Sequence, residues 1–297
     1  MMEKETNFMM MALLQIEQWR EGKSPSTNAN YLTALRSFAD FTEGKEITLD
    51  DLNEPLIKAY EHWLREKGVC LNTISCYMRS LRSLYHQLGG EDDPFRKVFT
   101  GMMKTEKRAI AVKDISRLRK LSLRKGSRLE LTRDIFLFSV YTLGMPFVDV
   151  AYLRKQNLRD GFIVYMRHKT HQTIRVPLEP CMAEIIRKYK RDSSDYIFPI
   201  IRSDDSQKAY QQYRNHLGVY NKKLKELAKL AGIEANLTSY VVRHTWASLA
   251  YEKNVDLCVI SKALGHTNTQ TTQIYIREIN DERLAAANHT LLASFLE

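Results

Sequence analysis

The chain has 297 residues, enough for one large or two modest domains, and its 44% hydrophobic and 27% charged residues are ordinary for a globular protein. Lys and Arg exceed Asp and Glu by 45 to 35, and the formal charge of +10 favours a polyanionic partner. The four cysteines lack metal-ligand or redox spacing, and no apolar run is long enough to span a bilayer. The sequence therefore argues against a metal or disulfide scaffold and against a membrane protein, and it predicts a cytoplasmic location.

The charge is unevenly distributed along the chain. Residues 1–100 carry 12 Lys and Arg against 15 Asp and Glu, whereas the remainder carries 33 against 20. Most of the positive potential is therefore expected in the C-terminal two-thirds, where a polyanion would be held.

The first hundred residues show the apolar periodicity of helices. The expected helices cover 7–19, a stretch from a cap at 24–27 to 41, 56–64, and a stretch from 72 or 73 to 85. Gly68 and the pair Gly89-Gly90 would end the last two. A compact bundle of about four helices is predicted.

Arg79 and Arg82 lie three residues apart on the fourth of these helices, opposite much of its apolar face. A solvated helix face explains this spacing by itself, and a phosphate-binding face is the alternative. After the bundle, residues 101–112 have the composition of a linker. Its Lys104, Lys107 and Arg108 could follow a nucleic-acid backbone or simply be solvated.

A second domain is expected from about residue 113, with helices over 114–122, 129–143, 146–154, 179–190 and 206–231. Two strands, 162–166 and 173–176, flank a turn that contains Lys169. A last helix over 282–296 has an apolar stripe and could be a terminal core helix. The fold class is therefore mainly α with a small β-hairpin or sheet (α+β).

Residues 240–275 contain the side chains with the clearest chemistry. Arg243 is followed by His244, a Gly265-His266 turn comes next, and Tyr275 ends the stretch. Helical spacing places Tyr240 on the same face as Arg243. A guanidinium, an imidazole and a phenol could converge on one anion, and Arg suits a phosphate because its planar fork binds two oxygens. Taken singly, Tyr275 could be a core aromatic and His266 a helix cap.

The ordered set Arg-His-Thr at 243–245, Leu-Gly-His at 264–266 and a Tyr nine residues later resembles the tyrosine recombinases of the phage-integrase family. The resemblance implies that Arg243 is the second catalytic Arg, His266 the late His and Tyr275 the nucleophile. It also implies that Lys169, in the hairpin turn, gives a proton to the departing 5′ oxygen of DNA. One ester replaces another in such a reaction, so no metal, ATP or other cofactor is expected.

Two positions depart from the family pattern. Pro146 stands where the first catalytic Arg is expected, and Tyr240 stands where a His or Lys is common. The text around Pro146 is similar to recombinases of Bacteroidetes mobile elements and invertible segments, some of which lack that Arg. Arg133 is the nearest candidate to supply the missing charge, although the residue taken by itself favours a surface position over a catalytic one. Tyr240 could orient the site as a neutral hydroxyl.

The resemblance also implies a domain plan and partners. Residues 1–100 would be a helical core-binding (SAM-like) domain that uses Arg79 and Arg82 on DNA phosphates, followed by a linker over 101–112 and a catalytic domain over 113–279. The segment 280–297 could be exchanged between protomers. The expected partners are a double-stranded recombination site, other copies of the chain up to a synaptic tetramer, and an accessory DNA-bending protein. The alternatives are a DNA-binding protein with a decayed site, a topoisomerase and a helical scaffold.

Overall fold

The computed structural model describes residues 7–19, 22–103, 109–266 and 272. The chain divides into two compact units, residues 1–105 and 106–297, which we call the N-terminal and C-terminal units. Within the described residues, no helix is both long and apolar enough to cross a membrane.

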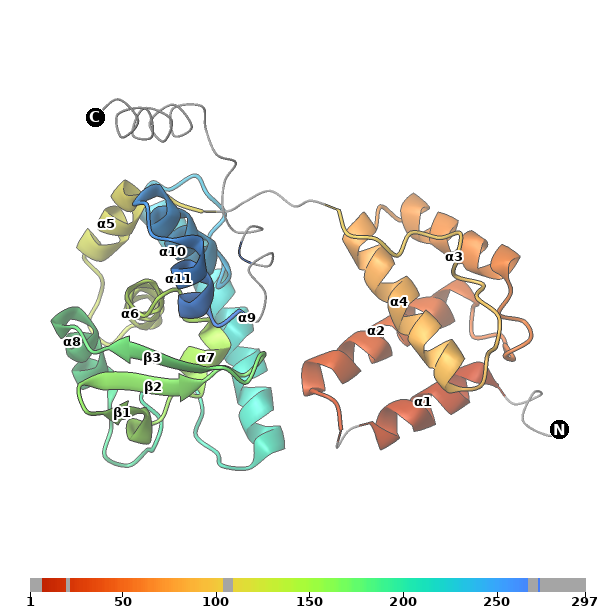
Figure 1. The fold of residues 1–297 in the computed structure, drawn as a ribbon, viewed down its shortest axis with the longest axis horizontal. Helices are drawn as coiled ribbons and strands as arrows, with labels where there is room; N and C mark the ends of the chain where they lie inside the picture. Colours follow the sequence, from red (N-terminus) through yellow and green to blue (C-terminus); the bar gives the residue numbers. More distant parts are fainter. Residues whose placement is uncertain (1–6, 20–21, 104–108, 267–271, 273–297) are drawn as a thin grey trace, which may run out of the picture. The chain divides into compact units, whose positions relative to one another are not determined.

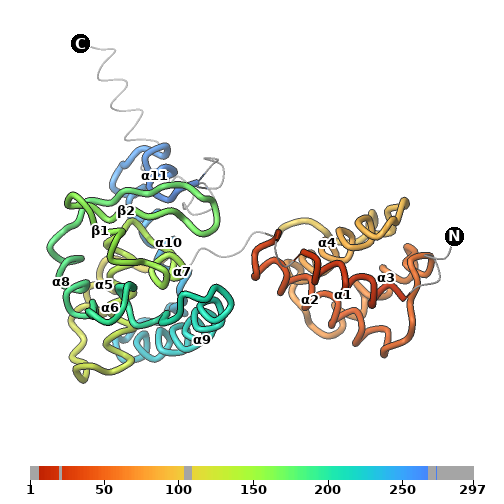
Figure 2. Tube along the Cα trace, turned by 90° about the horizontal axis from the view of Figure 1, so that it is seen from below, coloured from red at the N-terminus to blue at the C-terminus, as the bar shows by residue number. Residues whose placement is uncertain are grey.

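The N-terminal unit contains the four expected helices, α1 (Phe8–Gln18), α2 (Pro25–Phe41), α3 (Glu54–Glu66) and α4 (Leu71–Gln87) (Figure 2). Three of them begin at a side chain that caps a backbone N–H, namely Asn7, Ser24 and Asn53. A proline in the first turn of α2 and α3 fits there because those N–H groups need no partner. Phe38, which is fully buried, contacts Tyr60 edge-on at 5.1 Å between ring centroids.

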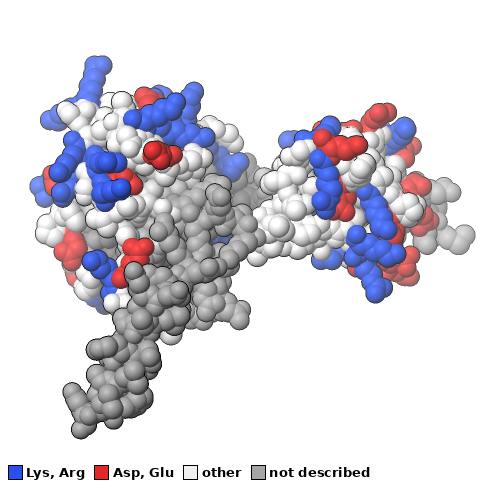
Figure 3. Space-filling model, turned by 90° about the horizontal axis from the view of Figure 1, so that it is seen from above, with Lys and Arg blue, Asp and Glu red and all other residues white. Residues whose placement is uncertain are grey.

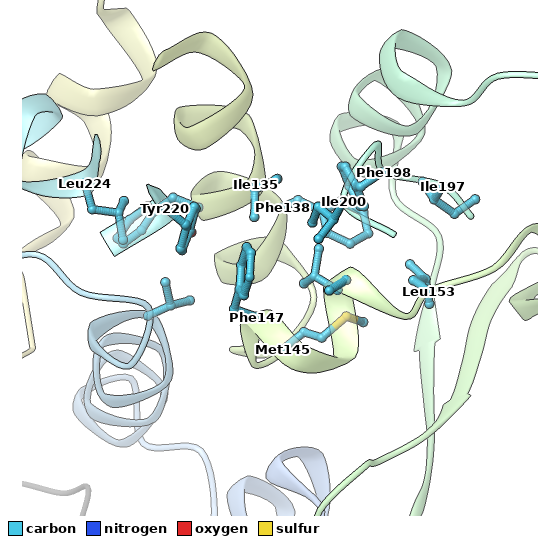
Figure 4. Packing of buried hydrophobic residues seen from close by; sticks show 14 of the residues in the cluster. Ile135, Phe138, Met145, Phe147, Leu153, Ile197, Phe198, Ile200, Tyr220 and Leu224 are labelled. Atoms are coloured by element: carbon cyan, nitrogen blue, oxygen red, sulfur yellow. The ribbon is translucent and has the colours of Figure 1, made fainter. Parts of the chain in front are cut away.

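The C-terminal unit is built round α6 (Arg128–Tyr141), a helix that is buried on most sides. It contacts α5 (Val112–Lys120), α7 (Phe147–Ala151), α8 (Pro180–Tyr189), α9 (Ser206–Leu230) and α10 (Val241–Glu252). Figure 1 shows it in the interior, and α11 (Leu257–Leu264) lies beside α10. Figure 4 shows the core at the end of α6, where Phe147 stacks on Tyr220 at 4.4 Å and Phe138 meets Phe198 at 5.0 Å.

A small antiparallel sheet joins β1 (Leu158–Arg159), β2 (Phe162–Met166) and β3 (Thr173–Pro177) in that order. The inward residues alternate along the hairpin, so that Ile163 pairs with Val176 and Tyr165 with Ile174, all buried. The α+β expectation is therefore confirmed, and the sheet has a third strand that the sequence did not suggest.

The helix expected over 146–154 is wrong in its length. Helix α7 ends at Ala151, because the carbonyl of Leu153 accepts the N–H of Ile197 and Arg154 forms a β-bridge with Tyr196. A short 3-10 turn, η1 (Lys155–Asn157), then leads into β1. The expected helix over 129–143 also stops earlier, at Tyr141, since Leu143 and Gly144 adopt left-handed backbone with φ of 59° and 70°.

Candidate functional site

Arg243 lies at the start of α10 with its side chain inside the protein, 4% exposed. The turn between α6 and α7 passes very close to it, because a Cβ added to Gly144 would stand 3.2 Å from the Cα of Arg243. One guanidinium nitrogen, Nη1, donates to the carbonyl of Gly144 at 3.4 Å, and Nη2 donates to the carbonyl of Leu264. Backbone carbonyls from the α6–α7 turn and from the last residue of α11 therefore fix this guanidinium.

His266 is brought to Arg243 by the end of α11. Gly265 caps that helix in the left-handed conformation with φ of 62°, which a residue without Cβ adopts readily. His266 Nε2 then lies 3.0 Å from Arg243 Nη2, and Nδ1 lies 2.8 Å from Thr272 Oγ1. Because Arg can only donate, Nε2 must accept, and we assign the neutral tautomer with its proton on Nδ1.

We expect the His266 imidazole to titrate at a pKa of about 4, below its ordinary 6.5, because burial and then the charge of Arg243 oppose its protonation. The folded state binds this proton less readily than the unfolded chain does. The stability from the neutral ring is therefore complete above pH 6.5 and is lost as the pH falls through about 4. An NMR titration of the ring protons measures the pKa, which should rise in an Arg243→Gln variant. A midpoint of 6.5 in both proteins would contradict the assignment.

A second buried guanidinium, that of Arg167, joins this cluster from the end of β2. Its side chain is 7% exposed. Arg167 Nη1 donates to the Leu264 carbonyl at 2.7 Å, so the same oxygen accepts from both Arg167 and Arg243. Arg167 also lowers the pKa of His266, after burial and Arg243. This residue is not among those predicted from the sequence, although position 167 continues the inward alternation of Ile163 and Tyr165, and that alternation was the signal that could have found it.

Asp149, on α7, is the carboxylate that holds this arrangement. Its Oδ2 accepts from Arg167 Nε at 3.3 Å, and its Oδ1 accepts the backbone N–H of His168 at 3.0 Å. The Asp149 side chain is 1% exposed, which makes the pair with Arg167 a desolvated one. The carboxylate thus ties α7 to both the end of β2 and the hairpin turn.

Lys169 lies in that turn and is exposed. The turn is fixed on either side of it, since the His168 ring lies against Tyr152 with centroids 4.3 Å apart and Thr170 Oγ1 donates to the Gly265 carbonyl at 3.0 Å. Lys169 is near enough to lower the pKa of His266, after burial and the two arginines. Within the part of the chain that the structure describes, Lys169 has no ion-pair partner.

The structure does not bring Arg133 to this cluster. Its Nε and Nη2 both lie 2.8 Å from Asp134 Oδ1, and Nη1 donates to the Leu121 carbonyl at 2.8 Å. Asp134 in turn binds Lys188 and Tyr189 of α8. The guanidinium of Arg133 is therefore used between α5, α6 and α8, and it shares none of these partners with Arg243.

The other candidate residues are spread over both units. Tyr240 precedes α10, is 54% exposed, and packs edge-on against His244 with centroids 5.0 Å apart. Arg79 on α4 is exposed and Arg82 is half-buried. Figure 3 shows Lys and Arg interspersed with Asp and Glu on the visible faces of both units. Tyr275, Lys104, Lys107 and Arg108, and the segment 280–297, lie outside the described residues.

Metal ligands do not gather at this site. Among the described residues there is no group of three or more His, Cys, Asp or Glu side chains that could hold a metal ion. The chemistry available to the cluster is that of two guanidiniums, a neutral imidazole and an ammonium group round one small region. Such a set of cations and hydrogen-bond donors can bind an anion.

Two family models match the chain. The one described as "Phage integrase family" matches residues 108–282, and the one described as "Phage integrase SAM-like domain" matches residues 7–87. Tyrosine recombinase XerA of Thermococcus kodakarensis is 27% identical, over 86% of this chain and 86% of its own length. Tyrosine recombinase XerD of Agrobacterium fabrum is 24% identical, over 94% of this chain and 93% of its own length.

Solved structures agree on the fold. A lambda integrase dimer bound to a COC′ core site has a TM-score of 0.68 at 14% identity, covering 92% of this chain and 78% of that chain. The Tn1549 transposon integrase in complex with circular intermediate DNA has a TM-score of 0.68 at 15% identity, over 95% of this chain and 99% of that chain. At such identities the likeness concerns the fold alone.

Proposed function

The chain belongs to the phage integrase family, and we propose on that basis that it is a site-specific tyrosine recombinase acting on double-stranded DNA. The family membership expected from Arg243, His266 and Tyr275 is thereby confirmed. In the proposed reaction the enzyme cuts and rejoins DNA strands through a covalent 3′-phosphotyrosyl intermediate.

The observation that supports this function best is the contact between Arg243 and His266. The two residues are 23 positions apart, and the end of α11 brings Arg243 Nη2 within 3.0 Å of His266 Nε2. The neutral imidazole accepts from Arg243 and so helps to fix a guanidinium that can donate charge-assisted hydrogen bonds to a phosphate group. A protein that served only as a helical scaffold would not need a buried guanidinium held beside an imidazole.

The proposed chemistry assigns one role to each side chain. The Tyr275 oxygen attacks the scissile phosphorus, the new Tyr–phosphorus ester forms, and the bond from phosphorus to the 5′ oxygen breaks. A phenol has a pKa of about 10, so nearby cations help by favouring the phenolate, and the phenolic proton passes to solvent water. Arg243 stabilises the charge that gathers on the non-bridging oxygens, and the Nδ1-protonated imidazole of His266 helps to orient it.

Lys169 completes the cleavage step. Its ammonium proton passes to the departing 5′ oxygen, which leaves as a hydroxyl. The 5′ hydroxyl of a partner strand then attacks the phosphotyrosine, and the Tyr275 ester is released as the strands are exchanged. The exposed position of Lys169 in the hairpin turn leaves its ammonium group accessible to DNA.

The domain plan supports the same function. We propose that residues 1–100 grip DNA, with Arg79 and Arg82 on phosphates, and that Lys104, Lys107 and Arg108 follow the backbone in the linker. Residues 113–279 would carry the chemistry, and 280–297 would join protomers in a tetramer. A crystal structure exists of a lambda integrase tetramer bound to a Holliday junction. A cytoplasmic location and an accessory DNA-bending protein are part of the same proposal.

Trapping the covalent intermediate tests the proposal. The protein first selects its site from a random-sequence duplex pool, and that site is then rebuilt with a nick beside the scissile phosphate. The released 5′-hydroxyl fragment diffuses away from such a duplex, so a protein–DNA adduct accumulates. Peptide mass mapping should place the DNA on Tyr275, and Tyr275→Phe should give no adduct.

The matched control is Tyr210→Phe, because the Tyr210 hydroxyl is buried without a hydrogen-bond partner among the described residues. It should form the adduct at the rate of the intact protein. Specific binding without any adduct would instead identify a DNA-binding protein with a decayed site. An adduct that only reseals, without exchange between two labelled sites, would identify a topoisomerase.

A further inference from the structure

The feature that the proposed function leaves unexplained is a pair of buried arginines on a single acceptor. Arg167 and Arg243 are 6% and 4% exposed, and both donate to the carbonyl oxygen of Leu264. Two guanidiniums on one oxygen are only a few ångströms apart, so they repel each other in a poorly solvated region. Asp149 contacts Arg167 and offsets one of the two charges. Lys169 adds a third cation at the edge of the cluster.

We propose, on the basis of the proposed function, that Arg167 binds the scissile phosphate together with Arg243. A phosphodiester carries one negative charge, and that charge grows in the transition state of transfer to a tyrosine. Among the described residues, Arg167, Arg243 and Lys169 bring three positive charges against the carboxylate of Asp149, and a phosphodiester would balance part of that difference. Pro146 cannot contribute here, because it has neither a charged side chain nor an N–H.

The geometry leaves one part of Arg167 available for this contact. Nε donates to Asp149 at 3.3 Å and Nη1 donates to Leu264 at 2.7 Å. Nη2 has no hydrogen-bond partner within the described residues, and Arg167 has no further contact of this kind. The Arg167 guanidinium is therefore held in place while Nη2 can still donate to an oxyanion. Such a donor is preorganised, since no side-chain freedom is lost on binding.

The backbone at the C-terminal end of α11 lies close to the aliphatic part of the Arg167 side chain. A Cβ on Gly265 would stand 2.7 Å from Arg167 Cδ and 2.9 Å from Ile174 Cδ1, so only a glycine admits the side chain in this position. Asp149 is a positioning residue in the same arrangement, because it holds Arg167 and, through His168, the turn that carries Lys169. The guanidinium of Arg133, in contrast, is held by Asp134 and Leu121.

The test measures single-turnover adduct formation on the nicked duplex at saturating protein. Arg167→Ala should slow it by about 10²–10³-fold, while binding of the uncleaved site changes by less than about threefold. Arg167→Lys keeps the charge and the fold but cannot hold Asp149, Leu264 and a phosphate at once, so it should also slow the reaction at least about tenfold. Arg175→Ala is the matched control, because the Arg175 guanidinium lies over the Phe162 ring on the neighbouring strand.

A neutral scissile group separates phosphate binding from a structural role. When a methylphosphonate replaces the scissile phosphate, one charged oxygen is removed, and the difference between intact protein and Arg167→Ala should shrink to within about fivefold. An undiminished difference would overturn the proposal in favour of a structural role. So would full activity in Arg167→Lys and Arg167→Ala, or a loss seen in Arg133→Ala and absent from Arg167→Ala. Failure of the proposed function is distinct, since the intact protein would then form no adduct at all.

Discussion

Replacing Arg243 with Ala is expected to slow single-turnover cleavage by at least about 10²–10³-fold, the usual effect of removing one strong donor from a developing oxyanion. The residue donates to Gly144 and Leu264 and contacts His266, so the substitution also disturbs the loop that presents the imidazole. Arg243→Lys should recover only a small part of the rate. A single ammonium group cannot meet two carbonyls and a phosphate together.

The stability of the same variant should change less than its activity. Losing the donors leaves the Gly144 carbonyl unsatisfied, which costs about 1–3 kcal/mol, whereas the Leu264 carbonyl still accepts from Arg167. Removing one of two adjacent buried charges offsets part of that loss. Thermal melts of the two variants beside the cleavage assay measure both effects. The control is Arg117→Ala, since that side chain is 52% exposed and pairs with Asp114 on the surface of α5. A variant with full cleavage activity would remove Arg243 from the proposed mechanism.

Lys169→Ala is expected to lower the cleavage rate by about 10²–10⁴-fold, the range for loss of a general acid. The reason is the leaving group, because an alkoxide departs slowly unless it receives a proton. A duplex with sulfur in place of the bridging 5′ oxygen removes that need, since a thiol has a pKa of about 8.5 and leaves as a thiolate. On the sulfur duplex the variant should therefore come within about tenfold of the intact protein.

Arg243→Ala provides the contrast for this experiment. Its defect concerns the non-bridging oxygens, so the sulfur duplex should not restore its rate. An equal loss for Lys169→Ala on both duplexes would show that Lys169 has some other role, such as holding the DNA. The turn itself should stay in place in the variant, because Thr170 and His168 fix it through Gly265, Asp149 and Tyr152.

Most of the fold could be predicted from local signals. Side chains that cap helices, prolines in first turns and period-2 alternation depend on neighbours in the sequence, and they gave the four N-terminal helices and the hairpin. The helix that is predicted with the wrong length depends on contacts with residues far away in the sequence. Helix α7 ends where Tyr196, 42 residues beyond Arg154, takes the chain into a bridge, and no local pattern encodes that contact.

The site was predicted in part for the same reason. Arg243 and His266 were found because their motif is compact in the sequence, and the structure brings them together. Proximity to Pro146 along the chain favours Arg133, yet its guanidinium binds Asp134. Arg167 is 21 residues beyond Pro146 and reaches the cluster only through the fold of the hairpin onto α11. Its position, which continues the inward alternation of β2 by one residue beyond Met166, is the sequence signal that points to it.

The acceptor shared by the two arginines belongs to the main chain. Any residue at position 264 would offer the same carbonyl oxygen, so mutation of the side chain there leaves the anchor of both guanidiniums in place. The Leu264 side chain is fully buried with Ala247 and Ile260, so packing is what restricts the choice of side chain at this position. Evolution can therefore vary the core under α11 without altering the charge arrangement above it. Gly265 cannot vary in this way, because its positive φ and its lack of a Cβ are both needed to accommodate the Arg167 side chain.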